Sequence, residues 1–503
     1  MERNLANKNS GVASWFRDQI ITRKMASPLG LLILAILSVY MAYATVLISY
    51  KLTAGLTFVV GGALLCILSV MYPWAGYVLS FVVCFFLLLP TRLTNVPIPI
   101  PTGLIPEFFS YLTLLAILTK DRYRQQITGE TWSSPIIWWS LVMVAYLFLI
   151  FFNPEMNSKV GWFNFTRKQI SFVIFILITY MLIDSRWSLK FFMRMWIIVS
   201  TIHALYACKQ QWLGFFGWEY SWLMADPKRV DLFINMGFVR RFGLVSDPAA
   251  AGILYACGCV LLLILGIRTK AAKKKFAYLL LAVIHFLASS YTGTRTATLM
   301  IVAGIAFYCI LTLYERRTLI FSAIFGIGLI GLLYAPIYNN MIINRLRSTF
   351  EGSKDPSALV RDLNRKMVQP YVWKHPIGGG LNTAGMAGAT YNPGHYLSSI
   401  PPDSAFMQTM MEQGPIGLAM LLIFYYFVLR AGIKYFYRVK DPYIKTLYVA
   451  NLVSIFTMMV AQFSQQAIGQ YPSVLYFYAG IALLLKMQQF DRNVKTTETI
   501  EST

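Results

Sequence analysis

Two long polar stretches, residues 208–247 and 338–403, carry basic residues that could bind an anion. The second stretch holds seven Lys and Arg residues against three acidic residues before Asp403. The planar guanidinium of arginine donates paired hydrogen bonds that match the geometry of phosphate. These charges therefore either bind an anionic ligand or form an ordinary solvated surface. The candidate side chains are Arg240, Arg241, Arg345, Arg361 and Lys374.

A further arginine, Arg295, lies between two apolar segments in the polar sequence Ser289-Ser-Tyr-Thr-Gly-Thr-Arg-Thr-Ala-Thr298. A charge at a membrane boundary is costly unless it is paired or reaches the lipid headgroups, which makes Arg295 a functional candidate. It is predicted either to bind an anion, helped by the neighbouring hydroxyl groups, or to extend its side chain toward headgroups.

Asp403 and His375 are the candidate bases. Asp403 follows two prolines at the start of an apolar segment, so it is either a helix N-cap or a general base that nearby arginines keep ionised. His375 is a loop histidine with a structural partner, a base or a ligand. The glycine run after it, 378–380, permits a tight turn or a close backbone approach, and it lacks the lysine of a phosphate-binding loop.

Two other features limit the chemistry. Ser246 or Asp247 can cap the helix that begins at Pro248, but a cap does not explain the adjacent Arg240 and Arg241. No two histidines have the spacing of metal ligands, so we predict neither a metal site nor a cofactor.

Membrane helices must position these residues. The chain has 503 residues, of which 57% are hydrophobic and 13% charged, whereas soluble domains carry about 25% charged residues. Because about 20 apolar residues cross a bilayer as a helix, we predict an all-α polytopic membrane protein with about 12–14 transmembrane helices. The candidate spans are 29–50, 55–71, 74–90, 104–119, 135–152, 168–184, 190–207, 248–267, 277–293, 296–314, 319–337, 404–429, 446–464 and 472–487.

The charges predict the orientation. Cytoplasmic loops of membrane proteins collect Lys and Arg, which explains the net charge of +23 without a nucleic-acid partner. Basic clusters at 268–275 and 430–445 fall on the side predicted to be cytoplasmic, as do both termini. The short outer loops hold few basic residues, and Arg92 is one of them. The predicted parts are a cytoplasmic segment 1–28, a single membrane domain 29–487 with periplasmic loops 208–247 and 338–403, and a disordered cytoplasmic tail 488–503.

Over residues 240–430 the chain resembles the O-antigen ligase/polymerase superfamily of bacterial surface-polysaccharide assembly. Thr292-Gly-Thr-Arg295 is similar to the family's Ser-x-Ser-Arg element, and Arg241-Phe-Gly with Asp247-Pro248 is similar to its Arg-x-x-Gly-x-x-x-Asn-Pro element. The set Arg345, Arg361 and His375-Pro-Ile-Gly-Gly-Gly resembles its loop element Arg…Ser…Arg…Pro-x-x-Gly-x-Gly. Asp403 to Gln408 with Glu412-Gln-Gly414 and Gly417 resembles its element His-Asn-x-x-Leu-x…Glu-x-Gly-x-x-Gly.

The resemblance implies metal-independent, inverting transfer of a glycan from undecaprenyl diphosphate to a sugar hydroxyl, at the periplasmic face of the inner membrane. Arg240, Arg241, Arg295, Arg345 and Arg361 would bind the diphosphate, with Arg295 also acting in catalysis, and Asp403 would accept the proton. Lys374, His375 and Glu412 are further candidates. The implied partners are the lipid-linked oligosaccharide, a glycan acceptor, membrane lipids and a chain-length regulator.

Family ligases are thought to use a histidine at the position of Asp403, so we expect a polysaccharide polymerase. The alternatives are an O-antigen ligase that transfers glycan to a lipid or protein acceptor and, in another class, a polysaccharide flippase or secondary transporter.

Overall fold

The computed structural model describes residues 27–47, 50–94, 102–126, 129–235, 237–334, 347 and 356–501, and these residues are almost entirely helical. The predicted site residue Arg345 and nearly all of the predicted N-terminal segment lie outside the described residues.

The helices of the first half are α2 (Pro28–Leu47), α3 (Tyr50–Met71), α4 (Pro73–Phe86), α5 (Leu89–Thr94), α6 (Leu104–Leu118), α7 (Asp121–Arg124), α8 (Gly129–Trp132), α9 (Pro135–Ile150), α10 (Lys159–Leu182), α11 (Arg186–Trp212), α12 (Gly217–Met224) and α13 (Pro227–Phe233). A short antiparallel hairpin follows, in which β1 (Ile234–Asn235) pairs with β2 (Phe238–Val239).

The helices of the second half are α14 (Pro248–Arg268), α15 (Ala272–Tyr291), α16 (Arg295–Leu311), α17 (Arg316–Tyr334), α19 (Pro356–Lys374), α20 (Gly385–Tyr391), α21 (Ala405–Phe436), α22 (Pro442–Ala461) and α23 (Ser473–Glu501). Two short 3-10 helices, η3 (Tyr396–Ser399) and η4 (Ala467–Gly469), complete the elements.

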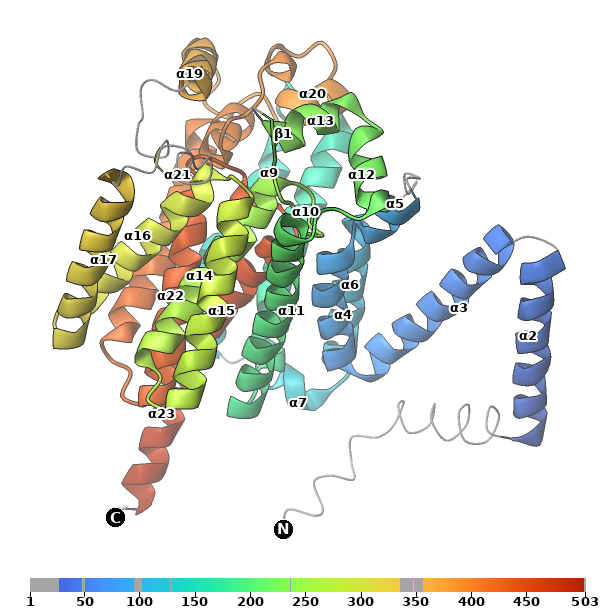
Figure 1. The fold of residues 1–503 in the computed structure, drawn as a ribbon, viewed down its shortest axis with the longest axis horizontal. Helices are drawn as coiled ribbons and strands as arrows, with labels where there is room; N and C mark the ends of the chain where they lie inside the picture. Colours follow the sequence, from blue (N-terminus) through green and yellow to red (C-terminus); the bar gives the residue numbers. More distant parts are fainter. Residues whose placement is uncertain are drawn as a thin grey trace. The chain divides into compact units, whose positions relative to one another are not determined.

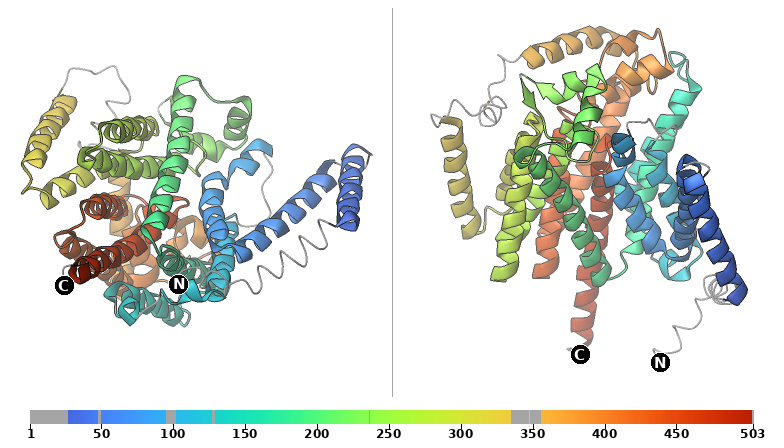
Figure 2. Two further views of the ribbon diagram at one scale, coloured as in Figure 1. Left: turned by 90° about the horizontal axis from the view of Figure 1, so that it is seen from below. Right: turned by 45° about the vertical axis from the view of Figure 1, so that its right-hand side comes forward.

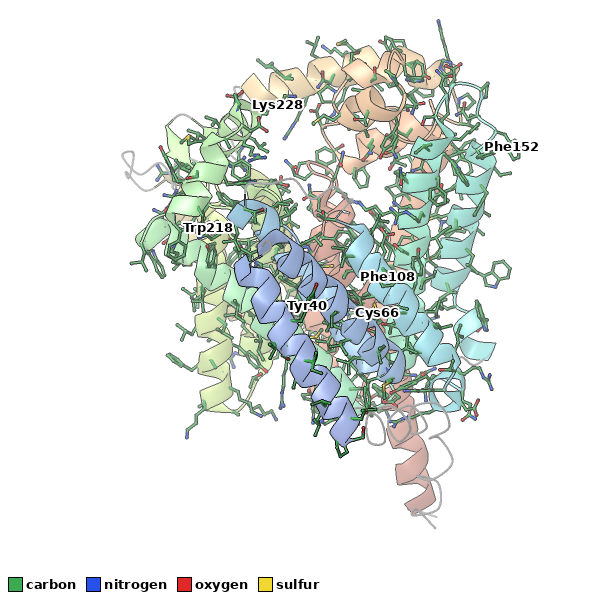
Figure 3. The ribbon with its side chains drawn as sticks, turned by 90° about the vertical axis from the view of Figure 1, so that its right-hand side faces the viewer. Tyr40, Cys66, Phe108, Phe152, Trp218 and Lys228 are labelled. Atoms are coloured by element: carbon green, nitrogen blue, oxygen red, sulfur yellow. The ribbon has the colours of Figure 1, made fainter. Side chains whose placement is uncertain are left out.

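The predicted all-α polytopic membrane fold is confirmed. Each predicted span overlaps a helix over its described residues. Among the described residues, six helical segments are long and apolar enough to cross a bilayer: Pro73–Thr94, Lys159–Leu182, Arg186–Trp212, Pro248–Arg268, Ala405–Phe436 and Pro442–Ala461. Shorter apolar helices accompany them, and the total of 12–14 crossings stays a prediction. Large apolar side chains cover the outside, such as Phe152, which is 78% exposed and points outward in Figure 3.

The contacts divide the chain into two compact units. The first comprises Met1–Ser80 and Phe108–Gln125. Within it, a Cβ atom at Gly76 would lie 2.9 Å from the Cβ of Ser69, and the Nζ of Lys120 donates a hydrogen bond of 2.5 Å to the carbonyl of Met71.

The second unit, Phe81–Glu107 and Gln126–Thr503, contains all the described candidate residues. Helix α14 is its centre and packs against α15, α16 and α22 (Figure 1). Glycine allows one of these close approaches, since a Cβ atom at Gly258 would lie 2.5 Å from the ring of His285. Helices α19 and α20 and the β1–β2 hairpin lie at one end of this unit (Figure 2), which we call the α19 end.

The C-terminal tail is described as part of α23, which continues through the segment 488–501 to Glu501. The disorder expected for 488–503 stays a prediction. No proline interrupts the chain after Pro472, so nothing ends the helix at the last apolar turn.

Candidate functional site

The β1–β2 hairpin fixes the two adjacent arginines against the turn that precedes Arg295. Arg240 donates from Nε to the carbonyl of Thr292 (2.9 Å) and from Nη2 to Oγ1 of Thr294 (3.0 Å). The backbone N–H of Arg241 donates to the carbonyl of Tyr291 at 3.1 Å. Residues fifty or more positions apart in the sequence are thereby joined at one place.

The turn itself is packed onto the first turn of α14. Thr294 donates from Oγ1 to the carbonyl of Pro248 at 2.9 Å, and a Cβ atom at Gly252 would lie 2.8 Å from the side chains of both Thr292 and Thr294. Arg295 is the first residue of α16 and is half-buried. Three of the predicted cations, Arg240, Arg241 and Arg295, therefore surround one short turn.

Arg241 presents the free end of its guanidinium. Its Nε donates to Oε1 of Gln211 at 2.9 Å, and its guanidinium carbon lies 4.9 Å from the ring centroid of Phe215. Neither terminal nitrogen has a partner among the described residues. Burial lowers the pKa of Arg241 below its usual value, but arginine stays protonated at neutral pH, so this fork can donate to an anion.

Asp403 does not cap α21. The N-cap is Ser404, whose hydroxyl accepts from the N–H of Met407 at 3.1 Å. The Asp403 carboxylate instead accepts a hydrogen bond of 3.1 Å from Nδ2 of Asn364, on α19. Arg361 precedes Asn364 by three residues and therefore lies on the same face of α19, half-buried. The structure thus places Arg361 on the helix face that contacts Asp403.

One segment, Gln462 to Ser464, contacts the elements that carry both groups. The carbonyl of Gln462 accepts from the N–H of Ala405 at 3.1 Å, two residues after Asp403. The Phe463 ring lies 5.5 Å from the guanidinium carbon of Arg365 on α19. Ser464 shares a hydrogen bond of 2.7 Å with Thr296, the residue after Arg295. The turn before Arg295, which the three arginines surround, and the start of α21 after Asp403 are therefore neighbours at the α19 end.

His375 and Lys374 lie elsewhere. They follow Arg361 by more than a dozen helical positions, or about 20 Å at 1.5 Å per residue. His375 donates from Nδ1 to the carbonyl of Tyr371 (2.8 Å), which leaves Nε2 3.6 Å from Oε1 of Glu155. Burial and the Glu155 carboxylate raise the pKa of Tyr371 above its usual value, so its hydroxyl stays protonated. The structure brings neither candidate to Asp403.

The glycine run after His375 docks onto a break in α21. Gly414 has φ 68° and ψ −176°, and Pro415 follows it inside the helix. Since proline has no N–H, it cannot donate to the carbonyl of Met411. The N–H groups of Gly379 and Gly380 donate instead to the carbonyls of Met411 (2.9 Å) and Glu412 (3.0 Å).

This docking confirms the predicted close backbone approach. A Cβ atom at Gly378 would lie 2.5 Å from the carbonyl carbon of Glu412 and from the nitrogen of Gly414. One at Gly414 would lie 2.6 Å from the carbonyl carbon of Pro376. Loop and helix therefore fit together through facing glycines.

Glu412 is completely buried. One carboxylate oxygen, Oε1, accepts from the N–H of Ala384 (3.4 Å) and from Nε2 of Gln408 (3.5 Å), both long for hydrogen bonds. It lines a cavity of about 450 Å³ between α9, α10, α20, α21, the segment after α22, and α23.

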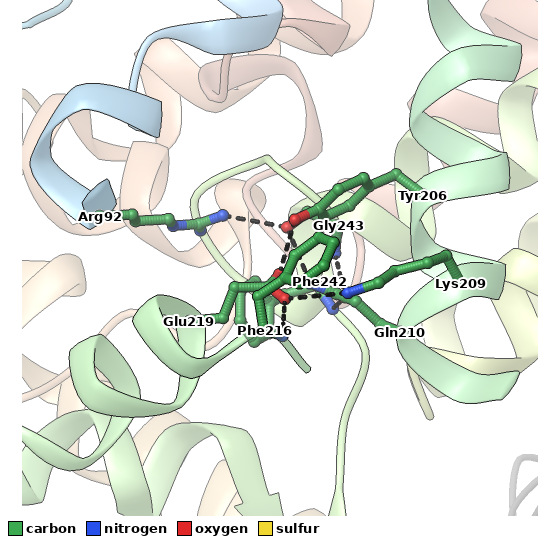
Figure 4. A network of polar contacts seen from close by, with 8 residues as sticks. All are labelled: Arg92, Tyr206, Lys209, Gln210, Phe216, Glu219, Phe242 and Gly243. Carbon is green, nitrogen blue, oxygen red and sulfur yellow. Dashed lines mark hydrogen bonds and ion pairs between the residues drawn. The ribbon is translucent and has the colours of Figure 1, made fainter. Parts of the chain in front are cut away.

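The sequence did not indicate the buried polar network that supports the loop between Arg241 and α14 (Figure 4). Arg92, expected in a short outer loop, is 1% exposed. It donates to the carbonyls of Gly243 (3.0 Å) and Val245, and its guanidinium carbon lies 4.7 Å from the rings of both Trp222 and Phe242. These contacts hold the loop between Arg241 and α14.

Glu219 is the acidic centre of the same network. Its carboxylate accepts from the hydroxyl of Tyr206 (3.0 Å), from Nε2 of Gln210 (2.5 Å) and from the N–H of Phe216 (2.7 Å), and it pairs with Lys209 at 3.4 Å. The sequence feature that could have indicated this network is a single glutamate in a basic, aromatic-rich stretch.

The start of α14 agrees with the prediction, because Asp247 is its N-cap and accepts from the N–H groups of Ala249 (2.8 Å) and Ala250 (2.9 Å). Over the described part of the chain, no group of three or more His, Cys, Asp or Glu side chains could hold a metal ion.

Residues 279–422 match the family model described as O-antigen ligase. The match supports the O-antigen ligase/polymerase superfamily. This superfamily comprises glycosyltransferase-like membrane enzymes of polysaccharide assembly, whose substrates are a lipid-linked glycan and an acceptor. The matched segment includes Arg295, Arg361, Asp403 and Glu412. A search of curated proteins finds no match.

Proposed function

We propose that this chain is a surface-polysaccharide polymerase, which transfers a glycan from undecaprenyl diphosphate to a sugar hydroxyl. The observation that carries the proposal is the position of three arginines, Arg240, Arg241 and Arg295, beside the segment 462–464, which also contacts α19 and the start of α21, two residues after Asp403. A cationic cluster next to a carboxylate is what transfer from a diphosphate requires, because one group binds the leaving group and the other accepts a proton.

In the proposed reaction, the acceptor hydroxyl oxygen attacks the anomeric carbon of the donor. A new C–O bond forms while the bond from that carbon to the diphosphate oxygen breaks, and the electron pair leaves with the diphosphate. Arg241, Arg295 and Arg361 stabilise the added negative charge, as cationic clamps do. Asp403 takes the hydroxyl proton, and attack from the side opposite the diphosphate inverts the anomeric configuration. The guanidinium groups perform the charge stabilisation, so the proposed reaction uses no metal ion.

The proposed location is the periplasmic side of the bacterial inner membrane, with both termini in the cytoplasm. The basic clusters at 268–275 and 430–445 support this orientation, because such clusters stay on the cytoplasmic side. The α19 end then faces the periplasm, where lipid-linked glycan and acceptor meet and a chain-length regulator would act.

A ligase is the second candidate, since the matching family model carries the description O-antigen ligase. Asp403 favours the polymerase, because the resembled ligases carry a histidine at this position. The two activities differ in the product that accumulates without them. Loss of a polymerase leaves single repeat units, whereas loss of a ligase leaves full-length polymer on its lipid carrier.

The test replaces Arg295 and Asp403 separately by alanine in a strain that lacks the chromosomal gene. We expect both variants to reach wild-type levels in the membrane and to produce only single repeat units, on gels of extracted glycan. The controls are Asp362→Asn, whose side chain is 65% exposed, and Arg430→Ala, which is also exposed; both should give normal polymer. Purified wild-type protein should keep its activity with a chelator present.

Normal polymer length in both site variants would show that the proposed site is wrong. Accumulation of lipid-linked polymer would identify a ligase. Activity that a chelator abolishes and a divalent ion restores would contradict the metal-free reaction.

A further inference from the structure

The cavity beside Glu412 begins close to Asp403 and extends along one face of α21. Ala405, Gln408, Thr409 and Glu412 line it, and their spacing of three and four residues places them on the same side of the helix. Ala405 follows Asp403 by two residues, and Glu412 lies about 10 Å further along the helix axis at 1.5 Å per residue. The cavity therefore leads away from the proposed general base.

Glu412 lines this cavity and has an unsatisfied carboxylate oxygen. Among the described residues, Oε2 of Glu412 is buried and has no hydrogen-bond partner, and Oε1 accepts two long hydrogen bonds. The backbone N–H groups of Asn382 and Thr383 also stabilise the charge of this carboxylate. Buried polar groups in native proteins are nearly always hydrogen-bonded, and an unpaired carboxylate is especially costly. A side chain held in this state within a membrane-spanning helix is a candidate ligand-binding group.

The rest of the lining identifies the ligand class. Amide side chains of Asn164, Gln408, Gln413 and Gln466 surround the cavity, together with Tyr391 and several apolar side chains. Amides donate and accept hydrogen bonds and carboxylates accept strong ones, which matches a molecule with many hydroxyl groups. A buried carboxylate repels a phosphate, and the lining contains a lysine, Lys168, which disfavours a cation.

The size agrees with a sugar ligand. The volume of about 450 Å³ falls within the range of about 300–1,000 Å³ that is typical of small-molecule sites. The lining also combines many apolar side chains with a few convergent polar groups, as such sites do.

We propose that this cavity binds the acceptor sugar and that Glu412 accepts hydrogen bonds from its hydroxyl groups. The inference rests on the proposed transferase function, to which it adds the place of the acceptor. The acceptor end enters beside Asp403, so that one of its hydroxyls lies next to the general base while its other hydroxyls bind Glu412 and the amides.

The experiment measures binding and polymer formation separately. The probe is the repeat-unit oligosaccharide of the producing strain, released from its lipid by mild acid and labelled with a fluorophore at the reducing end. Fluorescence polarisation with purified protein in detergent gives its dissociation constant. We expect Glu412→Gln, which keeps the side-chain shape, to weaken binding about tenfold or more, because hydrogen bonds to a charged group are lost.

A second variant keeps the test valid if Glu412→Gln fails to fold. Ala387 lines the cavity from α20, so Ala387→Phe should obstruct it and weaken binding by a similar factor. The matched control is Met386→Phe, at the neighbouring position of α20, whose side chain is 83% exposed. This control should bind the oligosaccharide like the wild type, and all variants should elute as single peaks in size-exclusion chromatography.

Wild-type binding by both Glu412→Gln and Ala387→Phe would overturn the cavity assignment, as would the absence of binding to wild-type protein. Polymer formation by the wild type, and its loss in Arg295→Ala and Asp403→Ala, would leave the proposed function standing in either case.

Discussion

Replacing Gly414 by alanine tests how the loop after His375 holds the break in α21. Gly414 has φ 68° and ψ −176°, a backbone conformation that is essentially restricted to glycine. The added Cβ would also lie 2.6 Å from the carbonyl carbon of Pro376. Because that atom belongs to the backbone, no side-chain rotation can relieve the clash.

Two costs determine the size of the effect. Holding a non-glycine residue in this conformation costs about 1–3 kcal/mol, and inserting a carbon into a packed contact costs about 1–3 kcal/mol more. We therefore expect Gly414→Ala to lower the free energy of unfolding by about 2–6 kcal/mol. Loss of the docked loop would also release the hydrogen bonds from Gly379 and Gly380, so glycan transfer should fall as well.

The control is Gly394→Ala. Gly394 also has a positive φ, 85°, but a Cβ atom there would meet nothing within 4 Å. Only the conformational cost applies, about 1–2 kcal/mol for a left-handed residue. Unfolding of both variants is measured in mixed micelles by titration with sodium dodecyl sulfate and followed by tryptophan fluorescence. Equal losses in the two variants, or a loss below about 1 kcal/mol at Gly414, would refute the reasoning about packing.

Two further predictions concern other parts of the second unit. Glu219→Ala should lower the free energy of unfolding by about 3–5 kcal/mol, since it leaves buried donors and a lysine without their acceptor; a loss under about 1 kcal/mol in a thermal melt would contradict this role. His395 has a lowered pKa, because burial and the His375 charge outweigh the opposing effect of Glu155. The folded state therefore binds the proton less readily than the unfolded state, and stability should be constant above the unfolded pKa of about 6.5 and decrease as pH falls below it. His395→Asn keeps an acceptor for the N–H of Leu397, and its stability should not decrease between pH 7 and 5. If this variant has the same dependence of melting temperature on pH as the wild type, His395 is not the cause of the decrease.

Local features of this chain were predictable from its sequence. Long apolar segments located the helices, and Asp247 before Pro248 located a helix start, because spans and caps depend on a few adjacent residues. The glycine run correctly predicted a close backbone approach. The capping interpretation of Asp403 was wrong because Ser404, one residue later, has the N-cap conformation and hydrogen bond.

Long-range contacts were not predictable in the same way. Arg92 and Gly243 are 151 positions apart, and no periodicity in either segment indicates that they meet. Glu412 was a candidate only through a resemblance, since its cavity is formed by six separate parts of the chain. The separation of His375 from Asp403 depends on the direction of α19, which composition does not specify.

The break in α21 also bears on the order in which this protein assembles. Because Pro415 cannot donate to the carbonyl of Met411, the inserted helix depends on Gly379 for that hydrogen bond, and the interior of a bilayer offers no water as a substitute. The loop precedes the helix in synthesis, and in the proposed orientation it would have to cross the membrane before the two could join. Under that proposal, loop translocation and completion of this helix would be one coupled, late step of biogenesis.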